Sequence, residues 1–371
     1  MVTLNIDGRE VLVPRKSTVL DAVRELGIVL PTLCHHPELS PFGGCRLCLV
    51  EISGRSRPVA ACCTLVQEGM VVHTATSHLE NLRRTNLELL LSDHPNDCML
   101  CERAGNCKLQ ELAYYYGLRD NRFIGERRTF EQQDNNPFIA RDMEKCVLCG
   151  QCVRICDEVQ GVEAIDFTSK GFWTNISPPF EKDLDCEFCG QCVGVCPTGA
   201  LTGRMWSFKG RQKFREVDTV CPYCGCGCNL TLAVKKNEIV RVYSRKDTIN
   251  NGMLCAKGRF GYEFVSSPDR LTHPLIRVGS KRDWELDQSN TYSQSSSSRE
   301  RSWDPGSFKE VSWEEALDYI ASSIKKIKEE HGPDSIGGLA SARCTNEENY
   351  LFQKFMRAAV GTHNVDHCAR Y

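Results

Sequence analysis

Apolar and polar positions alternate at the start of the chain, and the alternation predicts a strand hairpin. Residues 2–6 and 10–13 have the pattern of two short strands joined by a tight turn. A helix is expected over residues 19–26, with Thr18 as its N-cap and Asp21 three residues further on. The first part of the chain is therefore predicted as strand, strand, helix, followed by a loop that contains cysteines.

Apolar residues recur at helical spacing twice near the end of the sequence. Residues 313–330 and 346–360 are each expected to form a helix that begins with a capping box. Residues 335–340 between them predict a short buried strand, so this part has the pattern of an incomplete α/β domain. The apolar face of the second helix needs further structure to cover it. The capping pairs are Ser312 with Glu315 and Thr345 with Glu348.

Composition changes the picture, because 23 of the 371 residues are cysteine. The 46 Lys+Arg and 48 Asp+Glu nearly cancel, which gives no electrostatic footprint for nucleic acid. We find no apolar run of about 18 residues to cross a bilayer and no secretory signal. A cytoplasmic location is expected, where thiols stay reduced and dense cysteine indicates metal ligation. Residues 280–306, rich in serine, predict a surface insertion or linker.

The cysteines fall into sets of four. The first set has the spacing C-x10-C-x2-C-x13-C and follows the strand, strand, helix order of a plant-type [2Fe-2S] ferredoxin, although the loop spacing differs. Four thiolates also suit zinc, which is the alternative. Gly43 and Gly44 favour the cluster, because glycine lets backbone N–H donors approach a sulfide. The predicted ligands are Cys34, Cys45, Cys48 and Cys62.

The second set combines a histidine with three cysteines. Such a set is also a zinc pattern, and His94 before Pro95 could be an ordinary surface histidine. The position between two iron-sulfur modules favours a redox centre, and imidazole in place of thiolate raises a cluster's potential. The predicted ligands are His94, Cys98, Cys101 and Cys107.

The third and fourth sets are two runs of C-x2-C-x2-C-x3-C. Two such runs are typical of a bacterial two-[4Fe-4S] ferredoxin, in which the last cysteine of each run ligates the other cluster. Asp157 stands where proline is customary after the first run, and the segment between the runs is lengthened. One cluster is expected on Cys146, Cys149, Cys152 and Cys196, and the other on Cys186, Cys189, Cys192 and Cys156.

A fifth set follows in CPYCGCGC and MLCAKG. Cys63 and Cys226 adjoin predicted ligands, so the register of the first or the fifth set could slip by one or two residues. With Cys344 and Cys368 they make four spare thiols, which we expect to be small buried hydrophobic residues. The predicted ligands of the fifth set are Cys221, Cys224, Cys228 and Cys255.

These motifs carry a family resemblance over nearly the whole chain. Residues 1–213 resemble the N-terminal region shared by the large iron-sulfur subunit of NADH:quinone oxidoreductase, iron-only hydrogenases and cytoplasmic formate dehydrogenase alpha subunits. VCPYCGCGCNL, NNGMLCAKGRFGYEFV and DRLTHPLIR look like the start of a molybdopterin oxidoreductase. SARCTNEENYLFQKFMRAAVGTHNVDHCARY is similar to the segment that leads to the catalytic residue of formate dehydrogenases.

The resemblance implies an α+β multidomain fold. The expected domains are a [2Fe-2S] ferredoxin-like β-grasp at 1–78, a [4Fe-4S] module with one histidine and three cysteine ligands at 79–120, a two-[4Fe-4S] ferredoxin at 138–213, a molybdopterin oxidoreductase [4Fe-4S] domain at 214–275, the insertion at 280–306, and a partial α/β domain at 307–371.

The resemblance also implies one [2Fe-2S] and four [4Fe-4S] clusters, and in the full-length protein a molybdenum or tungsten bis-pterin guanine dinucleotide. Lys257 matches the family lysine between the last cluster and the pterin, with an ordinary surface lysine as the alternative. No catalytic residue is expected within this chain; a metal-binding cysteine or selenocysteine is expected immediately after Tyr371, encoded in the second case by an in-frame UGA.

Three functions remain open from the sequence. The first is the relay part of a formate dehydrogenase alpha subunit, interconverting formate and CO2 and passing electrons to an NAD(P)-linked flavin subunit, a ferredoxin or a hydrogenase. The second is the large iron-sulfur subunit of a respiratory NADH dehydrogenase. The third is a non-catalytic electron-transfer protein. The CTNEENY and HCAR segments favour the first, and the absence of a further hydrogenase cysteine set disfavours an iron-only hydrogenase.

Overall fold

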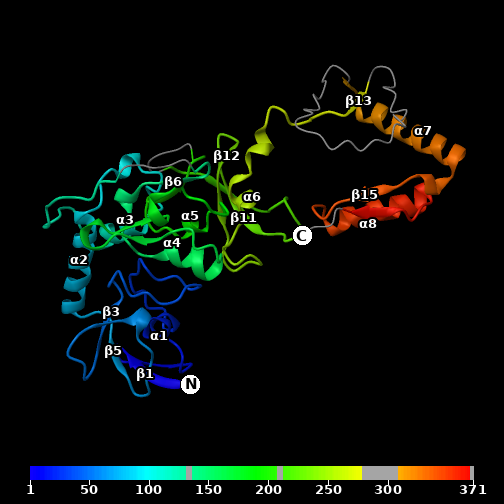
Figure 1. The fold of residues 1–371 in the computed structure, drawn as a ribbon. Helices are drawn as coiled ribbons and strands as arrows, with labels where there is room; N and C mark the ends of the chain where they lie inside the picture. Colours follow the sequence, from blue (N-terminus) through cyan, green and yellow to red (C-terminus); the bar gives the residue numbers. More distant parts are fainter. Residues whose placement is uncertain (131–135, 207–211, 278–307, 368–371) are drawn as a thin grey trace. The chain divides into compact units, whose positions relative to one another are not determined.

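The computed structural model describes residues 1–130, 136–206, 212–277 and 308–367 (Figure 1). The chain divides into two compact units. The first comprises Met1–Cys221 with Gly227–Glu263, and the second Pro222–Cys226 with Phe264–Tyr371. The expected insertion at 280–306 lies outside the described residues. Among the residues that are described, we find no helix that is long and apolar enough to cross a membrane.

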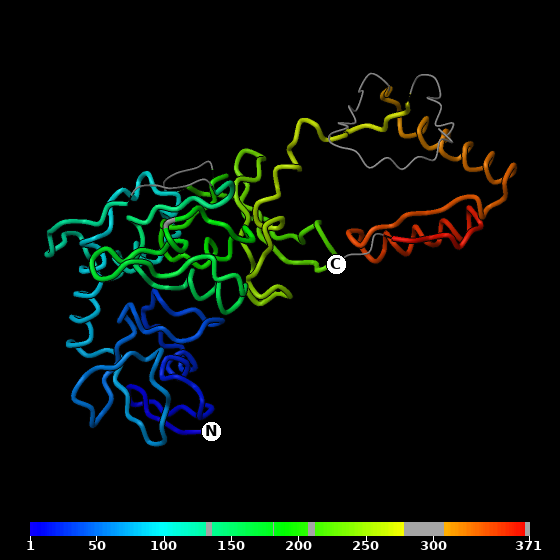
Figure 2. The backbone as a smooth tube through the Cα atoms, in the orientation of Figure 1, coloured from blue at the N-terminus to red at the C-terminus, as the bar shows by residue number. Residues whose placement is uncertain are grey.

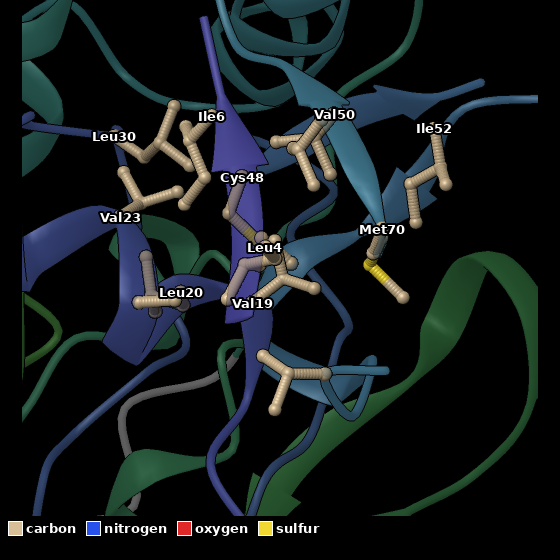
Figure 3. Packing of buried hydrophobic residues seen from close by; sticks show 14 of the residues in the cluster. Leu4, Ile6, Val19, Leu20, Val23, Leu30, Cys48, Val50, Ile52 and Met70 are labelled. Carbon is tan, nitrogen blue, oxygen red and sulfur yellow. The ribbon is translucent and has the colours of Figure 1, made fainter. Parts of the chain in front are cut away.

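A five-stranded sheet with one helix forms the N-terminal domain, with the strand order β2-β1-β5-β3-β4. The predicted hairpin and helix are confirmed to within one residue, and the Thr18–Asp21 capping box is present at the start of α1. Side chains from β1, α1 and β3 point toward one another in the core (Figure 3). The elements are β1 (Val2–Ile6), β2 (Arg9–Val13), α1 (Val19–Glu25), β3 (Leu49–Ile52), β4 (Val59–Ala60) and β5 (Val71–His73).

Two helices carry the segment that contains the second cysteine set. They are α2 (Ser77–Ser92) and α3 (Lys108–Tyr115), with a 3₁₀ turn at Cys98–Leu100 between them. Leu87 of α2 and Leu109 of α3 are buried against Leu33 and Leu47, which belong to the cysteine loops of the N-terminal domain. This shared core fixes the second set beside the first domain.

The two cysteine runs begin short helices in the next module. A hairpin of β7 and β8 fills the lengthened segment between the runs, and β6 pairs antiparallel with β9. Its elements are β6 (Ile139–Arg141), a 3₁₀ turn (Met143–Lys145), α4 (Gln151–Arg154), a π-helical turn (Ile155–Val159), β7 (Asp166–Thr168), a 3₁₀ turn (Gly171–Trp173), β8 (Asn175–Ser177), a 3₁₀ turn (Pro179–Glu181), α5 (Gln191–Val195) and β9 (Leu201–Gly203).

A three-stranded antiparallel sheet follows, in the order β10-β11-β12. This sheet was not predicted from the sequence, because the cysteine motifs on either side dominate the pattern there. A short helix, α6, comes after the sheet and begins directly after Cys255. The elements are β10 (Arg215–Val220), β11 (Asn229–Lys235), β12 (Glu238–Ser244), α6 (Ala256–Phe260) and a 3₁₀ turn (Glu263–Ser266).

The second unit confirms both helices predicted near the end of the sequence. Both N-caps are made, although only Thr345 and Glu348 form the reciprocal box. The buried strand expected at 335–340 is wrong in part: the strand covers Gly338–Ala340, and Leu339 is 83% exposed. The elements are β13 (Leu275–Arg277), β14 (Phe308–Glu310), α7 (Trp313–His331), a 3₁₀ turn (Pro333–Ser335), β15 (Gly338–Ala340), α8 (Asn346–Phe355), a π-helical turn (Met356–Val360) and β16 (Val365–His367).

Candidate metal centres

The four cysteines of the first set lie in mutual contact. The thiol of Cys34 hydrogen-bonds with Cys45 and Cys62, and Cys62 also hydrogen-bonds with Cys48. The hydrogen bond from Cys45 is the main reason that the pKa of Cys34 lies far below its ordinary value, and the hydrogen bond to Cys34 raises the pKa of Cys62. The backbone amide of Gly44 also bonds to Cys34, as expected of a loop that surrounds a cluster.

The second set lines a cavity of about 320 Å³, whose walls include residues of α2 and α3. His94, Cys98 and Cys107 line it, and the charge of Cys101 acts on Cys107. Within the described part of the chain, His94 Nδ1 is buried without a hydrogen-bond partner. Burial lowers the pKa of His94, so the ring is neutral and offers a lone pair. Such a nitrogen is more consistent with a ligand than with a solvated histidine.

The last cysteine of each run crosses to the other run. One cavity is lined by the thiols of the first three cysteines of the first run together with Cys196. A second cavity is lined by the first three cysteines of the second run together with Cys156. Burial raises the pKa of Cys192 to about 12, and raises that of Cys152 further still. Thiols buried in this way become thiolates only when a positive group such as iron binds them.

The loops of the two runs have the same backbone conformation. Leu148 N donates to Cys146 Sγ at 3.4 Å, and Phe188 N donates to Cys186 Sγ at 3.4 Å. Both Leu148 and Phe188 are left-handed with φ of 50°, and the glycine two residues after each is left-handed too. Successive N–H groups of such loops point toward one centre, where they stabilise negative sulfur.

The fifth set is divided between the two units. Cys221, Cys228 and Cys255 belong to the first unit, where Cys221 N donates to Cys228 O at 2.8 Å. A Cβ added at Gly258 of α6 would lie 3.6 Å from Cys221 Sγ, so this thiol faces the helix that Cys255 begins. Cys224 belongs to the second unit. Three of the four predicted ligands are therefore placed in one body.

The expectation that the spare thiols are buried is wrong for the three that the structure describes. Cys63, Cys226 and Cys344 are exposed, and Cys368 lies outside the described residues. Cys63 Sγ lies 3.6 Å from Cys62 Sγ and 2.7 Å from a Cβ that would be added at Gly43. Cys63 directly follows a ligand in the chain, and its side chain points to the outer side of the cysteine loop, which explains its exposure.

Lys257 is exposed in the first turn of α6. Its role toward a pterin stays a prediction. The buried cation of that helix is Arg259, which the sequence did not single out, and it lies between the fourth and fifth sets. Repetition of Gly-Gln-Cys-Val at 150–153 and 190–193 was a signal in the sequence for the polar residues around these sets.

The residues present fit iron-sulfur clusters. Four thiols line each of two cavities, N–H groups point at sulfur, and a histidine nitrogen is buried without a partner. Among the described residues, no group of three or more His, Cys, Asp or Glu side chains converges as for a single metal ion.

Five family models match consecutive parts of the chain. They are the 2Fe-2S iron-sulfur cluster binding domain at residues 1–77, the NADH-ubiquinone oxidoreductase-G iron-sulfur binding region at 83–122, the NADH-quinone oxidoreductase subunit 3 ferredoxin-like domain at 136–202, the molybdopterin oxidoreductase Fe4S4 domain at 214–267 and molybdopterin oxidoreductase at 270–371.

The whole chain aligns with longer curated proteins. It is 39% identical to the NADPH-Fe(3+) oxidoreductase subunit alpha of Geobacter sulfurreducens over 373 residues, and 39% identical to the NADH-quinone oxidoreductase G subunit 2 of Rhizobium meliloti over 376 residues. All of the chain is covered in both alignments, but only 40% of each relative. A chain of an NAD+-reducing [NiFe]-hydrogenase matches 57% of this chain and 91% of its own length, with 30% identity and a TM-score of 0.53.

The cysteine loops and the matching models define an iron-sulfur oxidoreductase with [2Fe-2S] and [4Fe-4S] domains. More particularly, the chain belongs to the molybdopterin oxidoreductase family, and its N-terminal iron-sulfur domains are like those of NADH-quinone oxidoreductase G subunits.

Proposed function

We propose that this chain relays electrons singly between a two-electron site and a partner subunit, through one [2Fe-2S] and four [4Fe-4S] clusters on its five cysteine sets. The observation that carries the proposal is the crossing of Cys156 and Cys196, which surrounds two adjacent cavities with four thiols each. Clusters exchange one electron each without moving heavy atoms, and redox-inert zinc would have no use in such an array.

The proposed ligands are those predicted from the sequence. The [2Fe-2S] cluster is assigned to the first set and a [4Fe-4S] cluster to each of the others, with His94 as the one imidazole ligand. Lys257 is proposed as the residue beside the pterin. The clusters would supply reversible one-electron storage, while the chain holds them at fixed spacing and shields them from water.

A partner is needed at each end of the relay. The names of the relatives mention NADPH, Fe(3+), NADH and quinone. We therefore propose a flavin subunit linked to NAD(P) at one end, with a ferredoxin or hydrogenase subunit as the alternative.

Formate is our candidate for the substrate of the complete protein. This rests on the likeness of residues 341–371 to formate dehydrogenases, within the part matched by the molybdopterin oxidoreductase model. Formate oxidation releases two electrons, one proton and CO2, and the family assigns it to molybdenum or tungsten held by two pterins. The alternative is a relay like that of the NADH-quinone oxidoreductase relatives, with no formate chemistry.

Double variants test the crossing directly. Cys146→Ser with Cys196→Ser should remove one [4Fe-4S] cluster, about four iron atoms per chain, because both ligate the same centre. Cys146→Ser with Cys156→Ser should remove two clusters, or about eight iron atoms. Cys344→Ser is the control and should keep full iron. Iron analysis after anaerobic reconstitution gives the result, and the reverse order of losses would contradict the assignment.

The full-length protein, produced with molybdate or tungstate, tests the substrate. Formate should reduce its clusters, as followed by EPR. Reduction by NADH or NADPH alone, with no response to formate at any metal loading, would favour the relay without formate chemistry.

A further inference from the structure

A buried arginine links the fourth cysteine set to the fifth. Arg259 of α6 is 5% exposed, and its Nε donates to the carbonyl of Cys189 at 3.1 Å. Its Nη2 donates to Gln191 Oε1 at 3.0 Å, and Gln191 Nε2 donates to Leu254 O at 2.9 Å. Leu254 directly precedes Cys255, so three hydrogen bonds connect a cysteine of one set to a cysteine of the next.

The same pair of residue types links the first set to the third. Gln151 stands in the first run where Gln191 stands in the second, and its Nε2 donates to Leu33 O at 2.5 Å, next to Cys34. Arg154 then donates to the carbonyl of Cys34 at 2.6 Å. This places α4 against the cysteine loop of the N-terminal domain (Figure 2). Each junction thus contains one glutamine and one arginine.

The arginine comes from a different element at the two junctions. In the first run it lies two residues after Cys152, and the equivalent position of the second run is Gly194. A Cβ added at Gly194 would lie 3.3 Å from Nη1 and 3.4 Å from Nη2 of Arg259. The guanidinium of α6 therefore occupies the space beside the position from which Arg154 extends in the first run.

Burial makes this cation costly unless negative charge faces it. The charged groups that act on Arg259 are the thiols of Cys192, Cys189 and Cys255, together with Arg103. Thiolates that carry a cluster would supply the negative charge. When the cluster takes up one electron from a donor, its charge falls by one unit and no bond or proton changes. A fixed cation nearby stabilises that reduced state.

We propose that Arg259 is a positioning residue that holds the fourth cysteine set against the fifth and raises the reduction potential of the cluster on Cys156, Cys186, Cys189 and Cys192. Gln191 completes the connection to Cys255. This inference rests on the proposed relay function.

The test is an EPR-monitored redox titration of the anaerobically reconstituted chain. The signal that disappears in Cys156→Ser identifies the cluster. Arg259→Gln should keep the cluster and shift its midpoint potential to a lower value, because the variant removes the charge and keeps a hydrogen-bond donor. Arg259→Lys keeps the charge and should remain near the potential of the unaltered protein.

Two controls separate charge at this junction from arginine loss in general. Arg83 is as deeply buried, and it donates to the carbonyls of Leu49 and Thr74 away from the fourth set. Arg83→Gln and Arg154→Gln should leave the potential of this cluster unchanged. A shift of the same size in either control would overturn the inference.

The remaining outcomes are also decisive. An unshifted potential in Arg259→Gln, or equal shifts in Arg259→Gln and Arg259→Lys, overturns the inference and leaves the relay function standing. If Arg259→Gln loses iron, Arg259→Lys decides alone: an unchanged potential supports the inference and a lowered one contradicts it. Failure of the unaltered protein to bind iron would instead refute the proposed function.

Discussion

At the scale of single residues, the cysteine loops depend on glycines that allow close approach. Gly190 is left-handed with φ of 68°, and a Cβ there would lie 2.4 Å from Arg259 Cδ and 2.7 Å from Phe260 Cζ. These distances are shorter than any real contact, so a side chain at this position must displace α6 or the loop of the second run.

Gly190→Ala should therefore disrupt the junction. Overpacking of this kind costs about 1–3 kcal/mol, in addition to backbone strain. We expect loss of iron from the fourth set and a lower unfolding temperature for the full chain. Gly117→Ala is the matched control, because Gly117 is equally left-handed at 62° but has open space around its Cβ. Equal effects of the two variants would show that strain alone is responsible.

His94 gives a second prediction at this scale. His94→Cys should retain a [4Fe-4S] cluster and lower its potential, because a thiolate adds one negative charge. His78→Cys, at an exposed position on α2, is the control. A redox titration that is identical in both variants would count against His94 as a ligand.

The sequence predicted the candidate ligands because each set keeps its cysteines at fixed local spacing. The arginines were missed since their partners are distant in sequence: Arg259 contacts Cys189, and Arg103 donates to the carbonyl of Cys196 at 2.7 Å. Only folding brings such pairs together, and no periodicity records it.

At the scale of elements, local capping signals were enough to place the helix starts. Thr18 Oγ1 accepts from Asp21 N at 3.2 Å, and Asp21 Oδ2 accepts from Thr18 N at 2.8 Å. The strand at Gly338–Ala340 was predicted too long, because its apolar pattern is not matched by burial within the described part of the second unit.

Thr18→Ala should destabilise α1 by about 1 kcal/mol, through loss of one cap hydrogen bond. Hydrogen exchange of the α1 amides should become about five times faster if they open locally. Ser17→Ala, one residue before the cap, should leave the rates unchanged. Unaltered exchange in Thr18→Ala would mean that packing alone sets the stability of α1.

At the scale of the whole molecule, the domain order follows the cysteine order, but the arrangement in space does not. The sequence suggested that the second set lies between the first and third. In the structure, Gln151 and Arg154 of the third set contact the first directly, while Arg103 attaches the second set to Cys196. Domain packing depends on surfaces, and the spacing of ligands carries no information about it.

Iron content is the prediction for the complete array. One [2Fe-2S] and four [4Fe-4S] clusters require about 18 iron atoms per chain. Anaerobic reconstitution followed by iron and zinc analysis should approach this value with little zinc. A value near ten, or zinc in whole-number amounts without added zinc, would remove one or more of the assignments.

The crossing of Cys156 and Cys196 has a consequence for biosynthesis. During translation the first run emerges well before Cys196, so its three leading thiols must wait for the second run before either cavity has four ligands. Premature insertion of iron would leave an open, oxygen-sensitive corner on each cluster. Delivery of both clusters is therefore expected to be a single late event, and a protein with only one of the two should be rare in the cell.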